Sequence, residues 1–434
     1  MRSVAVVGAG QAGIVLSAAL LRRGWRVTLC SDLTAEQHLE SGARPTACLF
    51  GDQVDYEASL GLDLFPDAPR AGRIRLDLYT GDRLVAFSVD APLRKPALAV
   101  DQRLKYAHGL RELAARGATV VTGSVTPGDL ESLTATHELV VVTVGHKGFR
   151  GLFARDPVRS VHTSAQRSLF MVNVRDYDLD AHPRHRDIVF TFVPRVAEVF
   201  WIPFWDKDVG ASRSIVVESV PGGPADRFGG VTTASEGLAV LRGLVDEMLP
   251  GQSAFLEPTR PTRETTWIRG SVVPAVREPV AVLRSGRHVL GLGDAVVLND
   301  PIAAQGANNA TRMARFFAAR LDDYDGTATW LRARFDEFWE VGRYANGLSN
   351  GLMAPLTGYQ QDVLIAASRH PEIGERLWEG FDDPSSLFPW FFDAAAAREF
   401  LARRGVGRWD VLRYRLGLAG KVLGHRVFRR PAPA

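Results

Sequence analysis

The sequence predicts an α/β protein: a three-layer, Rossmann-type domain with a parallel sheet, interrupted by an inserted antiparallel sheet and followed by a helical region. Three observations predict this fold class. Residues 4–13 read VAVVGAGQAG, a strand that runs into a glycine-rich turn. Residues 73–89 alternate apolar and polar side chains, as an antiparallel hairpin does. A second strand and turn, at 290–311, returns late in the chain and completes the first domain.

The glycines of the first turn have the GxGxxG spacing of a dinucleotide-binding βαβ unit. Gly8 permits the tight turn, Gly10 lets the backbone approach a pyrophosphate, and Gly13 lets the following helix pack on its strand. We expect that helix over 11–23, with its N-terminal amides directed at phosphate, and a second buried strand over 25–30. The alternative is an α/β turn whose glycines are incidental.

Composition restricts the class of protein. A chain of 434 residues predicts two or three domains, and a net charge of +3 gives no general reason to expect nucleic acid or an anionic membrane as partner. No apolar run reaches the ~18 residues of a membrane span. The first strand begins within three residues of the N-terminus, which leaves no room for a signal peptide, so we expect a cytoplasmic protein. Two cysteines and ten histidines show no metal-ligand spacing, and no metal site is predicted.

The second strand ends without the expected acid. In NAD- and FAD-binding units a carboxylate about 20 residues past the glycines accepts hydrogen bonds from the ribose. Here Ser31 holds that position and Asp32 follows it. A hydroxyl in place of a carboxylate weakens such a hydrogen bond by ~1 kcal/mol, which predicts a loosely held cofactor.

Arg44 lies in an irregular stretch, 38–55, that carries SGARPTA. An arginine on such a loop beside a nucleotide fold can pair with phosphate or cover a flavin. A solvated arginine is an equally good interpretation.

The other half of the cofactor site is predicted at 290–311. A buried strand ends in Gly293-Asp294, a loop carries Asp300-Pro301, and a helix begins near Gln305. We expect Asp294 to accept hydrogen bonds from the ribityl hydroxyls of a flavin. The helix start at Gly306, Ala307 and Asn308 would direct backbone amides at the pyrimidine edge of the ring and stabilise its reduced anion. The GxGxxG turn together with this second motif favours FAD over NAD.

A second sheet is predicted from the hairpin at 73–89 and four β-like runs between 168 and 220. Its most distinctive segment contains Phe200, Trp201, Pro203, Phe204 and Trp205, which suit an apolar pocket wall or, equally, a hydrophobic core. Alternation allows only one subset to face a ligand, unless Pro203 resets the phase. Residues 238–248 predict an amphipathic helix that covers this sheet.

These elements predict three regions. The FAD-binding domain is discontinuous, over 1–55, 95–165 and 280–325. The substrate domain takes 56–94 and 166–279, and residues 326–434 form a helical region. The final segment, RYRLGLAGKVLGHRVFRR, is either a basic amphipathic membrane anchor or, as we favour, a solvated helix packed on the FAD-binding domain.

With these motifs in place, the chain resembles the flavoprotein monooxygenases of the para-hydroxybenzoate hydroxylase fold, and most closely the oxygenase components of styrene and indole monooxygenases. The resemblance is carried by VAVVGAGQAG, by SGAR at 41–44, by AVDQRL at 99–104, which contains Arg103, by VVPA at 272–275 and by GLGDAVVLNDPIAAQGAN at 291–308. It covers about the first three quarters of the chain.

The resemblance implies a two-component enzyme. A separate NADH-dependent flavin reductase would supply reduced FAD, O2 would form a C4a-hydroperoxyflavin, and one oxygen atom would epoxidise or hydroxylate a small aromatic or olefinic substrate. It implies Arg44 and Arg103 as cofactor-binding residues and Ala47, Cys48 and Pro301 as flavin-proximal residues. Styrene enzymes carry asparagine and threonine where Ala47 and Cys48 align, which leaves the substrate open. A homodimer is left open too, and neither nucleic acid nor membrane is expected as a partner.

Two other enzyme classes share this fold. Single-component NAD(P)H-dependent hydroxylases usually place an aspartate where Val144 stands, so self-reduction is disfavoured. Flavin-dependent halogenases carry two tryptophans before an Ile-Pro pair and an essential lysine. Here Glu198 and Phe200 occupy the two tryptophan positions before Ile202-Pro203. A flavin-binding protein without catalytic activity is the remaining alternative.

Overall fold

The computed structural model describes residues 1–80, 83–145, 149 and 151–428, with the side chains from 421 onward left out. The chain folds into two compact units, each assembled from three separate stretches of sequence. Unit 1 comprises 1–68, 100–166 and 272–350, and unit 2 comprises 69–99, 167–271 and 351–434. No helix among the described residues is long and apolar enough to cross a membrane.

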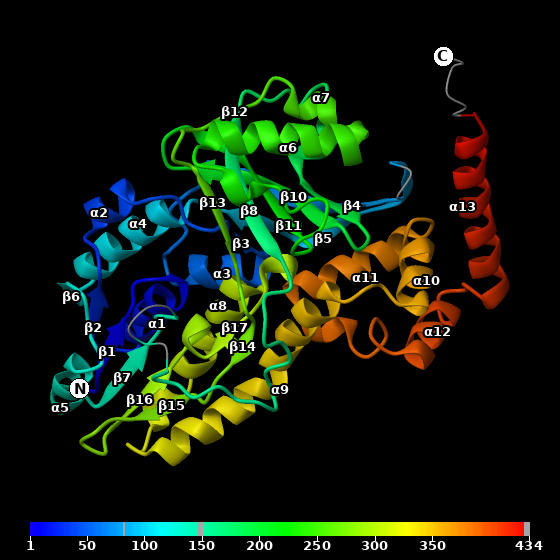
Figure 1. Cartoon of the computed structure of the whole chain (residues 1–434). Coiled ribbons are helices and arrows are strands. Elements are labelled where there is room, and N and C mark those ends of the chain that lie inside the picture. The colour runs from blue at the N-terminus through cyan, green and yellow to red at the C-terminus, as the bar shows by residue number, and fades with distance from the viewer. Residues whose placement is uncertain (81–82, 146–148, 150, 429–434) are drawn as a thin grey trace. The chain divides into compact units, whose positions relative to one another are not determined.

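Unit 1 is built on a mixed, mainly parallel sheet of the order β15-β16-β7-β1-β2-β6, in which only the edge strand β15 runs antiparallel to its neighbour. Figure 1 shows these strands side by side. Their bounds are Val280–Val282 (β15), His288–Gly291 (β16), Leu139–Val142 (β7), Ser3–Val7 (β1), Arg26–Ser31 (β2) and Thr119–Thr122 (β6).

The helices of unit 1 are α1 (Gln11–Arg22), α2 (Ala35–Glu40), α3 (Gly51–Ser59), α4 (Gln102–Ala115), α5 (Asp129–Thr136), α8 (Gln305–Ala318) and most of α9 (Ala328–Met353). Short strands are β3 (Cys48–Leu49), β14 (Ala275–Val276) and β17 (Val297–Leu298). The strands β1 and β7 are buried along their whole length, and their Val- and Leu-rich sequences form the centre of the unit's core. The predicted βαβ unit and the helix at Gln305 are confirmed.

Unit 2 contains a sheet with the order β12-β8-β11-β10-β9-β4-β5, with β13 also paired to β8. The bounds are β4 (Arg70–Tyr79), β5 (Val85–Ala99), β8 (Ser168–Arg175), β9 (Ile188–Val193), β10 (Ala197–Asp206), β11 (Gly210–Ser219), β12 (Arg260–Pro261) and β13 (Trp267–Ser271). Its helices are α6 (Ala234–Met248), α7 (Ser253–Leu256), α10 (Gly358–Ala367), α11 (Pro371–Asp382), α12 (Ala394–Ala402) and α13 (Arg408–Phe428).

The expectation of a purely antiparallel second sheet is wrong at one pair. The hairpin β4–β5 and the run β9-β10-β11-β8 are antiparallel, but β4 pairs with β9 in parallel. Parallel neighbours require a long crossover, and here the chain passes through unit 1 between β5 and β8. The predicted turn at 80–83 and the segment after Val144 lie partly outside the described residues.

The predicted helical region 326–434 is divided between the two units: residues up to 350 group with the first, and the rest with the second. In unit 2, α11 packs on β5, where a Cβ added to Gly374 would lie 3.0 Å from the Cβ of Ala91 and 3.3 Å from Val89 Cγ1. The role of each region in binding flavin or substrate stays a prediction.

The two faces of the second sheet follow from its register. Val89 pairs with Leu76, Leu76 with Phe190, and Phe190 with Phe200. Directly paired residues point to the same side of a sheet, so Phe200 lies on the side of β5 that α11 covers. We call this side the α11 face and the opposite side, covered by α6, the α6 face.

Trp201 lies on the α6 face and has no exposed surface. It packs edge-on against His185 and Phe255, and its indole N–H donates to Thr191 Oγ1 over 3.3 Å. The core that surrounds it includes the buried leucines of α6. Trp201 is therefore a core residue rather than part of an open pocket wall.

We expect Trp201→Ala to lower the free energy of unfolding by about 3–5 kcal/mol, because it empties a large core volume. The matched control is Val209→Ala at the exposed turn between β10 and β11, for which we expect a change within about 0.5 kcal/mol. Denaturant unfolding of both variants measures the difference. Equal effects would place Trp201 outside the core.

Candidate functional site

The glycine turn after β1 makes two close approaches that only glycine permits. Gly8 has φ = +114°, and a Cβ there would lie 2.6 Å from Thr143 Oγ1. A Cβ on Gly13 would lie 1.9 Å from the carbonyl oxygen of Gly8. At Gly10 the nearest atom would be the Tyr106 hydroxyl, 3.9 Å away, so this position is open. The roles predicted for the three glycines agree with this geometry.

The start of α1 is suited to an anion. Its N-cap is Gly10, which provides no side-chain hydrogen bond, and its first turn contains no acidic residue. The first amides of such a helix lack intrahelical partners and carry the positive end of the helix dipole. We call this helix start, together with Gly8, Gly10 and Gly13, the phosphate cradle. These features fit the pyrophosphate of a dinucleotide cofactor.

The strand order brings the predicted flavin-binding segments to one edge of the parallel sheet. Gly8 follows β1, Val144 follows β7, and Asp294 follows β16; these are adjacent strands in the order β16-β7-β1. A Cβ on Gly145 would lie 2.9 Å from the Asp294 carbonyl oxygen, which shows how closely these turns approach one another. The carboxyl edge of such a sheet is where doubly wound folds bind ligands.

Asp294 is the predicted acidic residue at this edge. Its residue surface is exposed to solvent, yet the protein that surrounds its carboxyl group raises its pKa to about 6, an effect that the Arg277 charge only partly offsets. Gly293 has φ = +61°, and a Cβ added to it would lie 3.0 Å from the Cβ of Ala12 in α1. This close approach places Asp294, the next residue, beside the phosphate cradle.

Ser31 ends β2 as predicted, but its hydroxyl already forms hydrogen-bond contacts with other residues of the protein. It is buried, donates a hydrogen bond to the carbonyl of Leu33 over 2.6 Å, and lies 3.2 Å from His38 Nε2. His38 is buried as well, and desolvation together with the Arg44 charge lowers its pKa. Asp32, in contrast, is exposed. Of the two residues predicted here, Asp32 therefore has the accessible carboxylate.

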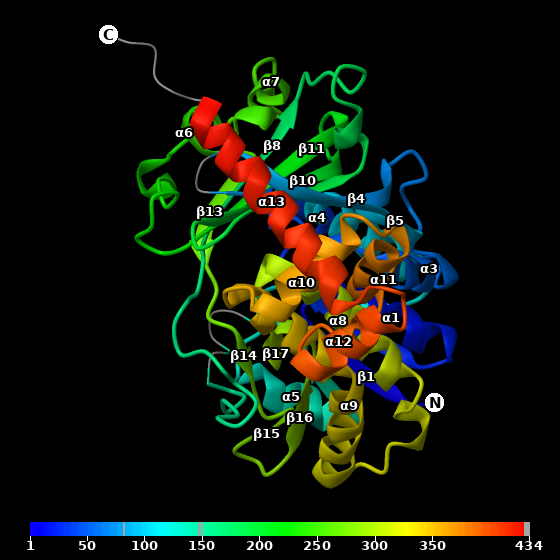
Figure 2. The same cartoon turned by 90° about the vertical axis from the view of Figure 1, so that its right-hand side faces the viewer.

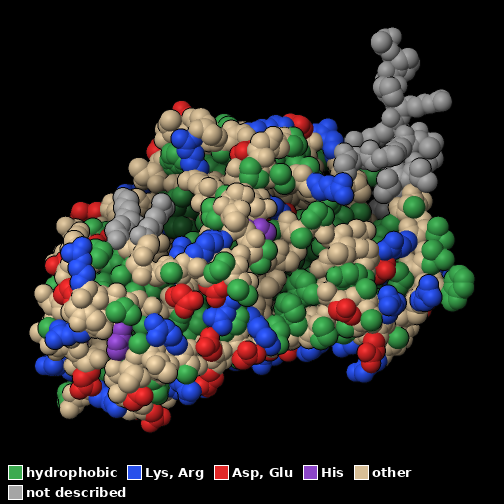
Figure 3. All heavy atoms as spheres, turned by 60° about the horizontal axis from the view of Figure 1, so that its bottom comes forward, with side chains coloured by type: hydrophobic (Ala, Val, Ile, Leu, Met, Phe, Trp, Pro, Cys, Tyr) green, Lys and Arg blue, Asp and Glu red, His purple; other side chains and the backbone are tan. Residues whose placement is uncertain are grey.

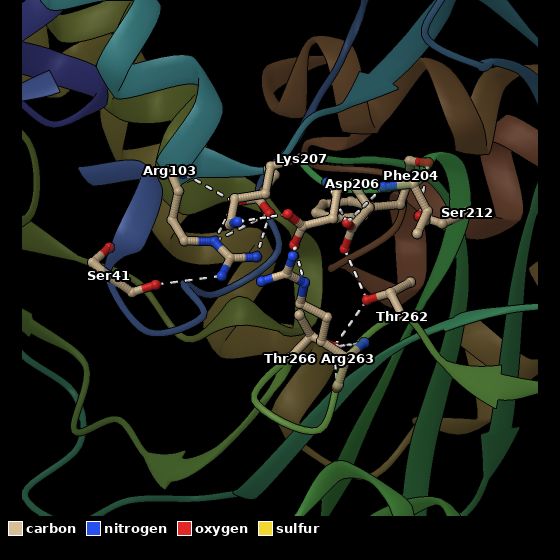
Figure 4. A network of polar contacts seen from close by, with 12 residues as sticks. Ser41, Arg103, Phe204, Asp206, Lys207, Ser212, Thr262, Arg263 and Thr266 are labelled. Atoms are coloured by element: carbon tan, nitrogen blue, oxygen red, sulfur yellow. Dashed lines mark hydrogen bonds and ion pairs between the residues drawn. The ribbon is translucent and has the colours of Figure 1, made fainter. Parts of the chain in front are cut away.

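The two predicted arginines have different environments. Arg103 is buried and donates to both carboxylate oxygens of Asp101, with Nη2 2.6 Å from Oδ2. Its Nη1 donates to the carbonyl of Ser41 over 3.3 Å, as Figure 4 shows. Arg103 thus anchors the start of the SGAR segment. Arg44 is partly exposed. Its charge adds to the desolvation that lowers the pKa of His38, and it opposes the desolvation that raises the pKa of Tyr106, so Arg44 lies near both groups.

The loop before α8 is held in an unusual conformation. Asp300 accepts a hydrogen bond from the Ile302 N–H over 3.1 Å, and Ala304, the N-cap of α8, has a left-handed φ of +50°. Residues other than glycine rarely adopt this conformation, and such strain is often found at functional sites. The helix start has no side-chain cap, and a Cβ on Gly306 would meet nothing within 4 Å. The amides of Gly306 and Ala307 therefore begin a helix with open space beside it.

Asn308 connects this helix to the segment that carries Ala47 and Cys48. Its side-chain N–H groups donate to the carbonyls of Cys48 and Ala304, over 2.8 and 2.7 Å, and its oxygen accepts from the Phe50 N–H over 2.9 Å. Desolvation raises the pKa of Cys48 to about 12, so its thiol stays neutral and is no nucleophile. Pro301 is partly exposed at the first position of a short 3₁₀ turn, Pro301–Ala303.

The aromatic segment of β10 separates cleanly into two faces. Its pairing with β11 runs without a break through Pro203, which lies opposite Arg213. Pro203 therefore does not reset the alternation; instead, pairing with β9 ends at Trp201, before the residue that lacks an N–H. Trp201, Pro203 and Trp205 alternate onto the α6 face. Phe200, Ile202 and Phe204 alternate onto the α11 face, where the rings of Phe200 and Phe190 stack 4.6 Å apart.

Unit 2 contains a buried ion pair that the sequence analysis did not predict. Arg167 Nε lies 2.7 Å from Glu198 Oε2, its Nη2 lies 3.0 Å from Oε1, and Nη2 also donates to the Met353 carbonyl. Only the unusual position of Glu198 in an apolar strand could have indicated it. Sequence reasoning likewise missed His38 and Tyr106, because each lies in an unremarkable helical segment. Among the described residues, no group of His, Cys, Asp and Glu side chains is arranged to hold a metal ion.

Comparison with known proteins agrees with this geometry. The family model described as "Styrene monooxygenase A putative substrate binding domain" matches residues 145–254. Styrene monooxygenase StyA of Pseudomonas fluorescens is 23% identical over 412 residues, which cover 90% of this chain and 97% of the relative. A second styrene monooxygenase StyA, from a Pseudomonas species, is 24% identical over 414 residues with the same coverage.

Solved structures share the fold. A flavoprotein/dehydrogenase from Cytophaga hutchinsonii aligns with a TM-score of 0.63 at 14% identity, covering 93% of this chain and 98% of that one. p-Nitrophenol 4-monooxygenase PnpA of Pseudomonas putida gives 0.60 at 14% identity, covering 88% and 99%. The flavin-dependent brominase Bmp2 gives 0.59 at 14%, covering 92% and 99%. The predicted fold class, the resemblance to styrene monooxygenase oxygenase components and the FAD-dependent monooxygenase class are confirmed.

We expect the stability of the cofactor-free protein to depend on Asp294. Its pKa is raised on folding from about 3.8 to about 6, so its stabilising effect is complete below pH 3.8 and disappears as the pH rises through 6. Asp294→Asn should therefore match the wild type near pH 4 and exceed its melting temperature above pH 6.5. At the same time it should bind FAD less tightly, because it loses a charged acceptor. A parallel pH dependence of both proteins would contradict the shifted pKa.

Two substitutions at the end of β2 test which residue there binds the ribose of FAD. Asp32→Asn should weaken FAD binding by about fivefold to tenfold, the value of one charged hydrogen bond. Ser31→Ala should leave the FAD dissociation constant within about twofold, because the Ser31 hydroxyl bonds to the protein itself. Fluorescence titration with FAD measures both. The reverse ranking would make Ser31 the ribose ligand.

Proposed function

We propose that this FAD-dependent monooxygenase is the oxygenase component of a two-component system. A separate NADH-dependent flavin reductase would supply reduced FAD, and the enzyme would use it with O2 to epoxidise or hydroxylate a small aromatic or olefinic substrate, such as styrene or indole. The likeness to styrene monooxygenases over nine tenths of the chain supports this substrate class.

The observation that carries the proposal is the row of groups at the carboxyl edge of the parallel sheet. The phosphate cradle, Asp294 and the uncapped start of α8 can hold an extended dinucleotide, while an aliphatic side chain, Val144, follows β7 at the same edge. A Cβ on Gly8 would lie 2.7 Å from Val144 Cγ2, so this side chain packs over the turn. No carboxylate stands at this position to organise a nicotinamide donor, which favours reduction elsewhere.

The residues of the site would act by binding and by electrostatics. The amides at the start of α1 and the Arg44 charge would hold the pyrophosphate, and Asp294 would accept the ribityl hydroxyls. The amides of Gly306 and Ala307 would stabilise negative charge on the pyrimidine edge of the ring. Bound reduced FAD supplies the electrons that activate O2. Cys48, a neutral thiol, offers no base, and the proposal requires no acid or base side chain.

The substrate would be bound by unit 2, which contains most of the residues that match the substrate-binding-domain family. We place the contact on the α11 face of β10, with Phe200 and Phe204 as its aromatic members. The predicted pocket residues Trp201, Pro203 and Trp205 share the other face, which α6 covers, and Trp201 lies in its core. Apolar walls of this kind suit an uncharged aromatic substrate.

Halogenation is disfavoured by the contacts of Glu198. Glu198, at the first of the two tryptophan positions typical of halogenases, is committed to the buried pair with Arg167. A single-component hydroxylase is disfavoured by Val144. The cytoplasmic location, a homodimer and the identity of the reductase stay predictions.

The proposal predicts that NADH or NADPH alone will not bleach the flavin absorbance of FAD-loaded protein in a stopped-flow experiment. FAD reduced chemically without oxygen, then mixed with enzyme, air and styrene, indole or thioanisole, should give oxygenated products. Catalase must be present, so that free hydrogen peroxide is excluded as the oxidant. Rapid bleaching by a nicotinamide nucleotide would show a single-component enzyme, and no product from any substrate would contradict monooxygenation of this class.

Alanine at Phe200 or Phe204 should change the substrate range or the enantiomeric excess of the product, since each removes part of an apolar wall. The matched control is Trp205→Ala on the opposite face of the same strand, which should preserve selectivity. Chiral analysis of styrene oxide measures the outcome for each folded variant. A change confined to Trp205→Ala would place the substrate on the α6 face.

A further inference from the structure

The C-terminal helix α13 carries two apolar stripes. Val411, Tyr414 and Leu418 are spaced as one helical face and are partly buried. This side is fixed to α10 and the turn after it: the Tyr414 hydroxyl lies 3.1 Å from His370 Nε2, and Arg415 Nε donates to Asp362 Oδ1 over 2.6 Å. The helix is therefore docked on its own chain by one stripe.

The second stripe is exposed. Trp409, Leu412, Leu416 and Ala419 follow one another at intervals of three and four residues, so they share a face. Trp409 is 81% exposed and Leu416 64%. In Figure 2, α13 runs across the front of unit 2, with no described element of that unit drawn over it. We call these four residues the outer stripe.

Positive charge surrounds the outer stripe. Arg408 and Arg413 are exposed, and Asp410, which pairs with Arg413 over 2.8 Å, is the helix's one acidic residue in the sequence. By sequence alone, residues 408–434 contain seven Arg and Lys and one Asp, a net charge of +6, whereas the whole chain carries +3. The 407 residues before them are thus net negative. Figure 3 shows hydrophobic, basic and acidic side chains together on the right-hand side of the molecule.

These features argue against a second copy of the chain as the occupant. A stable dimer buries about 20–30 residues on each partner, and the outer stripe offers four. Two copies would also bring their positively charged segments together. The charge instead requires a negatively charged occupant, and the stripe requires one that accepts tryptophan and leucine.

We propose that the outer stripe docks the protein on the surface of an anionic phospholipid bilayer. Tryptophan and leucine enter the boundary between headgroups and acyl chains, and flanking arginines are attracted to anionic headgroups, as in other interfacial helices. This surface association is distinct from a membrane span. It goes beyond the proposed oxygenation and revises the expectation that no membrane partner exists. At the bilayer surface the protein would encounter an apolar substrate that dissolves in the membrane.

The test is co-sedimentation of the full chain with vesicles of phosphatidylcholine alone and of phosphatidylcholine mixed with phosphatidylglycerol. We expect binding to the mixed vesicles at low salt, loss of binding at high salt, and weak binding to phosphatidylcholine. Leu412→Ser with Leu416→Ser, and separately Arg408→Glu with Arg413→Glu, should each lower the partition coefficient at least about tenfold. Exposed sites outside α13 provide controls: Val158→Ser and Arg398→Glu should bind as the wild type does.

Fluorescence gives a second readout. Tryptophan emission should shift to shorter wavelength on adding mixed vesicles, and Trp409→Phe should remove most of that shift. Near-UV circular dichroism checks that each variant is folded. Equal binding to both vesicle types, no binding to mixed vesicles, or unchanged binding of both double variants would overturn the proposal. So would a concentration-dependent dimer, in analytical ultracentrifugation, that the Leu412→Ser, Leu416→Ser variant abolishes.

Discussion

The close approach of helix α1 to the turn after β1 is the constraint on which the proposed cofactor site depends. A Cβ on any residue other than glycine at position 13 would lie only 1.9 Å from the carbonyl oxygen of Gly8. The same turn brings Thr143 and Val144 against Gly8, and Gly293 against α1. Three adjacent strand ends thereby converge on the start of one helix. Without this packing, the N-terminal amides of α1 would not face the edge where Asp294 lies.

Desolvation keeps three titratable groups near this edge, Cys48, Tyr106 and His38, neutral at pH 7, whereas Asp294 stays mostly ionised. Desolvation raises the pKa of Cys48 to about 12, raises that of Asp294 to about 6, raises the pKa of the Tyr106 hydroxyl and lowers the pKa of His38. The positive groups near this edge include Arg44, Arg277 and the starts of α1 and α8. A dinucleotide carries negative phosphates, and a reduced flavin adds negative charge. The arginines and the two helix starts would together attract the negative charges of a bound cofactor.

Much of the fold was readable from the sequence because its signals are local. The glycine spacing at 8–13, the strand runs at 168–219 and the helix start at Gln305 each follow from short-range rules, and each was predicted correctly. The parallel pairing of β4 with β9 was not, because it depends on a crossover through another unit. The assignment of Ser31 failed to foresee its bond to Leu33, since hydrogen-bond partners of a hydroxyl are set by a turn geometry that residue type alone leaves open.

The aromatic residues of β10 show which features of a sheet the alternation of side chains along a strand can predict and which it cannot. Alternation predicted correctly that the aromatic residues of β10 divide between two faces, but it contains no information on which face a helix covers. That choice is made by α6, whose leucines fill the space around Trp201, and by α11, whose Gly374 approaches β5 on the other side. The proline could have altered the phase, but the pairing of β10 with β11 runs unbroken through Pro203 and Arg213. The residues of this six-residue segment therefore lie on two different faces of the sheet. Trp201 stabilises the sheet through the core under α6. On the α11 face Phe204 is buried, at 2% exposure, and Phe200 is partly exposed, so of these two rings Phe200 is the more accessible one for the proposed substrate surface.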